Sequence, residues 1–132
     1  MMSLNKVMLI GIVGKDPEVR YVEQGVAVAK FPLATTENAR TLQNGTQVPE
    51  RTEWHNIVTW RRPAEYVEKY VRKGDRLYIE GQLRTRSYDD RNGITRYVVE
   101  VWADRVEGLS SPRQGTTEQP SDPGADTTVA PF

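Results

Sequence analysis

PAEYVEKYVRKG, residues 63–74, is the one stretch of this sequence with the periodicity of an α-helix. Pro63 suits the first turn of a helix, because backbone N–H groups there have no acceptor within the helix and proline lacks this group. The apolar side chains that recur at helical spacing are Val67, Tyr70 and Val71. The cationic pair and the glycine at residues 72–74 are typical of a helix end. We therefore expect one helix here, and the flanking segments decide what it packs against.

The segments on both sides of this helix have the character of β-strands. The expected strands are residues 6–13, 19–22, 26–35 and 52–60 before the helix, and 77–86 and 94–106 after it. Asn44-Gly45 and Asn92-Gly93 are typical of tight hairpins. Several strands, one helix and two more strands form the plan of the OB-fold, a five-stranded Greek-key barrel with its helix between the third and fourth strands. We expect this all-β fold over residues 1–108.

Length and composition exclude several classes of protein. A chain of 132 residues is sized for one domain and a tail. It has no cysteine, and His55 is its only histidine, so disulfides, thiolate metal sites and histidine-rich metal centres are excluded. The apolar run at residues 7–13 lacks a signal-peptide cleavage site and suits a buried strand better. No run reaches the roughly 20 apolar residues of a membrane span. We expect a soluble, cytoplasmic protein without metal or cofactor.

The composition changes after Gly108. Residues 109–132 are rich in Ser, Thr, Pro, Gly and Gln, have no periodicity and carry a net charge of −2, which leaves +2 on the rest of a neutral chain. Such a segment buries too little apolar surface to fold, so we expect a disordered tail. Its last residues, Pro131 and Phe132, form an apolar tip beside the terminal carboxylate. This tip is either a docking peptide for a partner protein or an arbitrary end of the chain.

Aromatic and cationic side chains are interleaved in two of the expected strands. Thr52-Glu53-Trp54-His55 opens a strand that runs on to Trp60, and simple alternation places Trp54 and Trp60 on one face. Gly81-Gln82-Leu83-Arg84-Thr85-Arg86-Ser87-Tyr88 repeats the theme. Aromatic rings stack on bases, and arginines neutralise phosphates. The pattern predicts binding of a nucleic acid rather than catalysis.

Six segments, in order within residues 4–107, together resemble the bacterial single-stranded DNA-binding protein family: Asn5-Lys6-Val7 with Gly11, Asp16-Pro17-Glu18-Val19-Arg20-Tyr21, Leu33-Ala34-Thr35, Thr52-Glu53-Trp54-His55, Arg72-Lys73-Gly74 and Tyr78-Ile79-Glu80-Gly81-Gln82-Leu83-Arg84-Thr85-Arg86. The terminal Pro131-Phe132 is similar to the family's end as well. The resemblance implies an OB-fold that assembles as a homotetramer and wraps single-stranded DNA without sequence preference. It also implies a tail whose tip recruits enzymes of replication, recombination and repair.

Individual residues receive roles on this basis. The resemblance assigns base stacking to Trp54, Trp60 and Tyr88, and it places His55 near a subunit interface. Trp102 has no such assignment, and we expect it to pack. Seven cations are candidates for phosphate contact: Lys6, Arg20, Arg72, Lys73, Arg84, Arg86 and Arg96. Arg84 and Arg86 are the strongest candidates because they share a strand face. The pair at residues 72–73 fits equally well as a charge complement to the helix C-terminus.

The sequence departs from the family at two places. Ala39 stands where members commonly carry an aromatic residue, so we expect weaker or differently spaced wrapping of DNA. The approach to the tip, residues 126–130, has one aspartate where the family usually has a run of them. Docking of partners through the tip is therefore expected to be weakened or redirected.

Other functions remain open on the sequence alone. Asp89-Asp90 lies beside an Asn-Gly turn, where Asp has a local backbone role, and this favours a turn over a metal site. No phosphate-binding loop or activated nucleophile is present, so we do not expect an enzyme. An OB-fold module that binds protein with little DNA affinity is the principal alternative. A preference for RNA is a third, because stacking does not detect the 2′-hydroxyl.

Overall fold

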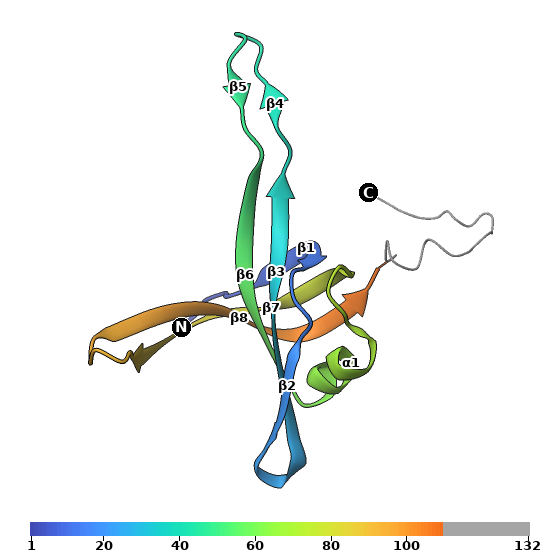
Figure 1. Ribbon diagram of the computed structural model, residues 1–132, viewed down its shortest axis with the longest axis vertical. Helices are drawn as coiled ribbons and strands as arrows, with labels where there is room; N and C mark the ends of the chain where they lie inside the picture. The colour runs from blue at the N-terminus through green and yellow to red at the C-terminus, as the bar shows by residue number, and fades with distance from the viewer. Residues whose placement is uncertain (110–132) are drawn as a thin grey trace, which may run out of the picture.

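A computed structural model of the chain describes residues 1–109 (Figure 1). Within this range five strands close a barrel: β1 (Val7–Val13), β3 (Val26–Glu37), β6 (Arg51–Trp60), β7 (Arg76–Asp89) and β8 (Thr95–Gly108). They pair in the circular order β1-β3-β6-β8-β7, and β7 returns to β1. The helix α1 (Arg62–Tyr70) lies between the third and fourth of these strands. This order confirms the expected all-β OB-fold. The predicted disordered tail lies outside the described residues, apart from Leu109.

Strand alternation builds the core on the inner face of the barrel. The buried side chains include Ala27, Ala29, Phe31, Leu33, Ile57, Leu77, Ile79 and Val101. Each large apolar side chain that is fully buried contributes about 1.5–3 kcal/mol. The helix adds Ala64 and Val67 to the same cluster. The inward positions of the barrel strands are thereby used for the core, which leaves the outward positions free for another purpose.

The helix begins and ends for local reasons. Pro63 occupies its first turn, as predicted, and the chain leaves the helix at Val71, which is extended. The Asp75 carboxylate accepts a hydrogen bond of 2.9 Å from the Arg72 amide, and Gly74 has φ +93°. The glycine permits a conformation that other residues rarely adopt, so the chain can turn directly into β7.

Three ribbons extend from the barrel (Figure 1). The short strand β2 (Glu18–Val22) pairs with the start of β3 through the turn η1 (Glu23–Gly25). The strands β4 (Arg40–Thr41) and β5 (Gln47–Val48) continue the β3–β6 ribbon, and the predicted Asn44-Gly45 turn joins them. The third ribbon is the distal part of β7 and β8, which meet at the predicted Asn92-Gly93 turn.

Strand β7 is longer than the sequence predicts. It continues from Arg86 to Asp89, because each of these residues has a partner on β8. Tyr88, expected just past the strand, therefore lies within it, opposite Arg96. Pairing with β8 makes residues 87–89 part of the strand. The strand propensity of these three residues alone does not predict it.

A register shift at Gly81 interrupts the pairing of β7 with β8, next to the residues of β8 that pair with β6. A Cβ atom at Gly81 would lie 2.2 Å from the backbone oxygen of Trp102. The two strands therefore approach so closely here that only glycine fits at this position. Bulges of this kind bend a strand and increase its twist. Beyond the shift, Gln82 lies opposite Trp102 and Arg84 opposite Glu100.

Candidate nucleic-acid interface

The strand registers place a set of aromatic and charged residues on one continuous surface. Val58 of β6 lies beside Trp102 of β8, and Trp102 lies opposite Gln82 of β7. On the other side, Arg20 of β2 lies opposite Val28, and Val28 lies opposite Trp60. We call this surface the outer face; its side chains include Arg20, Lys30, Trp54, Asn56, Trp60, Gln82, Arg84, Arg86, Tyr88, Glu100 and Trp102.

The predicted stacking residues are all on the outer face and all open to solvent. Trp54 is 58% exposed, Tyr88 is 48% exposed and Trp60 is 37% exposed. Trp54 lies against Gly14, where a Cβ atom would come within 2.4 Å of the Trp54 ring. The absence of a side chain at Gly14 is therefore what lets the indole lie close to the barrel. His55 lies on the opposite strand face from Trp54 and forms a 2.9 Å hydrogen bond with Thr35, and its place near a subunit interface stays a prediction.

Trp102 packs, as expected, but it does so on the outer face. Its ring centroid lies 5.6 Å from that of Trp60, with an angle of 40° between the planes. The Arg84 guanidinium lies 4.6 Å from the Trp102 centroid, a distance at which a cation is attracted to the indole ring. Trp60, Trp102 and Arg84 thus form one cluster, in which only two members were predicted to contact nucleic acid.

Arg86 is held by a carboxylate. Its Nε and Nη2 atoms donate to Glu100 at 3.0–3.2 Å, and Trp102 Nε1 donates to the same carboxylate at 3.1 Å. Burial raises the pKa of Glu100, but the hydrogen bonds from Arg86 and then Trp102 outweigh burial and hold this pKa below its ordinary value. Glu100 therefore stays ionised and offsets much of the charge of Arg86.

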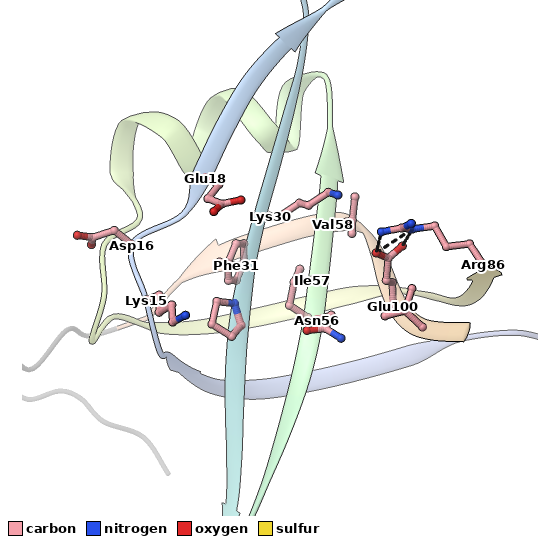
Figure 2. A pocket seen from close by; sticks show the side chains of 12 residues that line it. Lys15, Asp16, Glu18, Lys30, Phe31, Asn56, Ile57, Val58, Arg86 and Glu100 are labelled. Atoms are coloured by element: carbon pink, nitrogen blue, oxygen red, sulfur yellow. Dashed lines mark hydrogen bonds and ion pairs between the residues drawn. The ribbon is translucent and has the colours of Figure 1, made fainter. Parts of the chain in front are cut away.

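An open cavity of about 400 Å³ lies on the outer face (Figure 2). Asn56 and Val58, the two outward residues between Trp54 and Trp60 on β6, are part of its lining. Three cations, Lys15, Lys30 and Arg86, and three carboxylates, Asp16, Glu18 and Glu100, line it, and Figure 2 shows the cations on three separate segments of the chain. Lys15 and Lys30 were not among the predicted site residues. Only the pairing of β3 with β2 and β6, and of β6 with β8, brings them to the cavity.

The other predicted cations have varied surroundings. Arg20 lines a small cavity of about 190 Å³ with Trp60 and Lys30. Lys6 forms an ion pair with Glu80 at 3.2 Å, and Arg96 forms one with Asp90 at 2.8 Å. Arg72 donates to the carbonyls of Glu68 and Val71 at the end of α1, which is the alternative that the sequence left open for it. The backbone amide of Lys73 donates to Asp16.

Asp89 and Asp90 have the local role that the turn predicts. Asp90 accepts hydrogen bonds from the amides of Asn92 and Ile94, and Asp89 accepts one from Thr95. Among residues 1–109, no group of three or more His, Cys, Asp or Glu side chains is arranged to hold a metal ion. No helix in the same range is long and apolar enough to cross a membrane.

Comparison with known proteins identifies the family. Residues 4–109 match the single-strand binding protein family. The chain belongs to this family. A single-stranded DNA-binding protein of Bacteroides thetaiotaomicron is 62% identical over 109 residues, which are 83% of this chain and 68% of that protein. The fold resembles the single-strand binding protein of Plasmodium falciparum in complex with single-stranded DNA, with a TM-score of 0.76 and 34% identity, over 83% of this chain and 98% of the other.

Membership confirms the resemblance drawn from the six sequence segments. It also gives the two departures a structural context. Ala39 is exposed between β3 and β4, on the ribbon that extends furthest from the barrel in Figure 1. The second departure, at residues 126–130, lies beyond the part of the chain that the structure describes, as do Pro131 and Phe132.

The Glu100 site predicts a pH-dependent contribution to stability. A carboxylate whose folded-state pKa is lowered stabilises the fold above its unfolded pKa, about 4.3, and this contribution is lost as pH falls through the folded-state pKa. Glu100→Gln should lower Tm by several degrees at pH 7, and the difference from the unmodified chain should shrink below about pH 4. Thermal melts from pH 3 to pH 7 measure this. Glu107→Gln, at an exposed pair with Arg105, is the control. An equal Tm difference at every pH would contradict the assignment.

Proposed function

We propose that this protein binds single-stranded DNA without sequence preference. Bases would stack on Trp54, Trp60 and Tyr88, and phosphates would contact the cations of the outer face. The observation that carries the proposal is the pair of solvent-exposed tryptophans on one face of β6, with an open cavity beside the residues between them. Membership of the single-strand binding protein family and the likeness to a complex with single-stranded DNA support it.

The chemistry of the outer face suits a single strand better than a duplex. Stacking needs the flat side of a base, which a duplex hides, and it accepts all four bases because each has such a side. Among the predicted cations, Arg20 and Arg84 form no ion pair with a carboxylate of residues 1–109, while Lys6, Arg86 and Arg96 are each paired with one. Arg20, Arg84, Lys15 and Lys30 are therefore the cations that we assign first to phosphates.

The position of the face on the barrel supports the same function. OB-folds bind oligonucleotides on the face of their second and third strands and with the loops beside it. Here those strands are β3 and β6, and the ribbons of β2–β3 and β7–β8 flank them. We infer that residues 1–108 form the DNA-binding and oligomerisation domain. We further propose that the protein covers and protects exposed strands in the cytoplasm, beside the chromosomal DNA, with no reaction of its own.

Titration with oligo-dT tests the binding proposal. Oligo-dT should quench the tryptophan emission strongly, while a duplex of equal length should not. Trp54→Ala should cost about 1–3 kcal/mol of binding free energy, because one stacking position is lost. The logarithm of affinity should fall with the logarithm of salt concentration by about 0.7 for each neutralised phosphate. Tyr70→Ala, on the exposed part of α1, is the control.

A lack of quenching at low salt would favour a protein-binding OB module instead. Oligo-rU in the same assay measures any preference for RNA.

We also propose a homotetramer, as the family resemblance implies. Apolar side chains are exposed on β1 and on the side of the β7–β8 ribbon opposite the outer face, including Met8, Ile10, Leu83, Tyr97 and Val99. Burial of this surface between copies would remove it from water. Sedimentation equilibrium should give four times the chain mass of 15.0 kDa. The mass of a single chain at micromolar concentration would refute the assembly and leave the DNA-binding proposal standing.

The tail is proposed to recruit replication, recombination and repair proteins through Pro131 and Phe132. An aromatic ring followed by a terminal carboxylate is a recognisable docking group. Removal of residues 131–132 should leave the affinity for oligo-dT unchanged and abolish capture of partner proteins from an extract. A matched variant, Thr127→Ala, should retain both properties. Equal capture by the full and shortened chains would show that the tip is an arbitrary end.

A further inference from the structure

A second open cavity, of about 510 Å³, lies beyond Trp60 on the side away from Trp54. Its aromatic wall consists of Trp60 and Trp102, and its other lining residues include Arg61, Arg62, Gln82 and Asp104. The two tilted rings form an angled wall, on which a base can stack against one ring and touch the edge of the other. Neither Arg61 nor Arg62 has an ion-pair partner among the described residues.

Trp102 is positioned by three separate contacts. Trp60 packs against it at 5.6 Å, the Arg84 guanidinium lies 4.6 Å from its centroid, and its Nε1 atom donates to Glu100. Arg84 and Glu100 do not line the cavity, whereas Trp102 does. The indole is therefore held by groups around it and keeps part of its surface on the cavity. A ring that is fixed before binding loses little conformational freedom when a base stacks on it.

Arg61 has an unusual backbone conformation, with φ 60° and ψ −127°. Its amide donates to the Ala27 carbonyl at 2.8 Å, and its carbonyl accepts from the Glu65 amide at 3.0 Å, so the conformation is fixed at both ends. Glycine adopts this region without strain, and other residues do not. A side chain kept at such a position, next to a stacking tryptophan and on the rim of a cavity, indicates that the guanidinium has a use there.

We propose that this cavity is a nucleotide subsite, in which one base of the strand stacks on the wall of Trp60 and Trp102 and its phosphate contacts Arg61 and Arg62. The inference rests on the proposed binding of single-stranded DNA and extends it. It makes Trp102 a fourth stacking side chain, in a chain that has Ala39 where family members commonly carry an aromatic residue. The strand then runs from Trp54, past the cavity of Figure 2, to Trp60 and the subsite.

A single-tryptophan reporter tests direct contact without removing Trp102. The chain has three tryptophans, so Trp54→Phe with Trp60→Phe leaves Trp102 alone and keeps an aromatic ring at both other positions. Oligo-dT should quench this emission. An oligonucleotide that carries 5-iododeoxyuridine should also crosslink to the peptide that contains Trp102. If the unmodified chain binds and is quenched, but the reporter is neither quenched nor crosslinked, the subsite is refuted and the binding proposal stands. If the unmodified chain is not quenched, both fail.

Two substitutions test the energetic role. Trp102→Val should weaken binding to a long oligo-dT by about fivefold to a hundredfold, and Trp102→Phe should recover most of that loss. Because Trp102→Val removes a packed ring and can lower Tm, its Tm must be measured. Arg61→Gly is a second variant, whose expected effect on stability is the opposite. Arg61→Gly relieves the backbone, so Tm should not fall, while affinity falls severalfold and the salt slope becomes shallower by about 0.7.

Arg105→Gln is the matched control for charge, since Arg105 pairs with Glu107 away from the cavity. It should leave the affinity and the salt slope unchanged. An Arg61→Gly variant with unchanged affinity and slope would overturn the phosphate contact. If Trp102→Phe binds oligo-dT as weakly as Trp102→Val, the effect comes from lost packing of the indole ring, and the role of Trp102 in stacking is overturned.

Discussion

The parallel pairing of β6 with β8 is the constraint on which the rest of the structure depends. It covers only Ile57–Thr59 and Val101–Ala103, yet it joins the β3–β6 ribbon to the β7–β8 ribbon and closes the barrel. Two of its three pairs point inward and are buried in the core. The third, Val58 with Trp102, points outward and fixes where the two ribbons meet on the outer face. One short pairing therefore stabilises the core and also brings Trp60, Trp102 and Arg84 together.

The proposed binding of a polyanion by a chain of zero net charge depends on how the cations of the outer face are arranged. They are divided between those that a carboxylate restrains and those that remain available. Arg86 belongs to the first group, because Glu100 accepts hydrogen bonds from it and from Trp102. Arg20 and Arg84 belong to the second. Local arrangement rather than total charge sets the attraction for phosphates, since screening confines each charge to about 10 Å at ordinary salt concentrations. In the proposed function, the ion-paired cations would order the face and the unpaired cations would supply the affinity for phosphates.

Much of this structure could be predicted from particular residues of the sequence. Pro63 and the spacing of Val67 and Val71 located the helix, the Asn-Gly pairs located two turns, and alternation along residues 52–60 placed Trp54 and Trp60 on one face. Each of these signals lies within a short segment, so it can be recognised in a single sequence. The partners of Arg86 and the outward position of Trp102 beside Trp60 were not predictable. Both depend on the register between β7 and β8, which shifts at Gly81, and on a parallel pairing between strands far apart in the chain.

Exposed aromatic rings are normally a liability, and here three tryptophans lie on one surface. The structure limits this cost by holding each ring against the barrel: Trp54 against Gly14, and Trp60 against Trp102. A ring held in this way is less free than an exposed side chain and loses less entropy on binding. The strained backbone of Arg61 fits the same principle, since it stores unfavourable energy beside Trp60 in the free protein. In the proposed function, rigidity of the face before binding would favour stacking more than its apolar area alone.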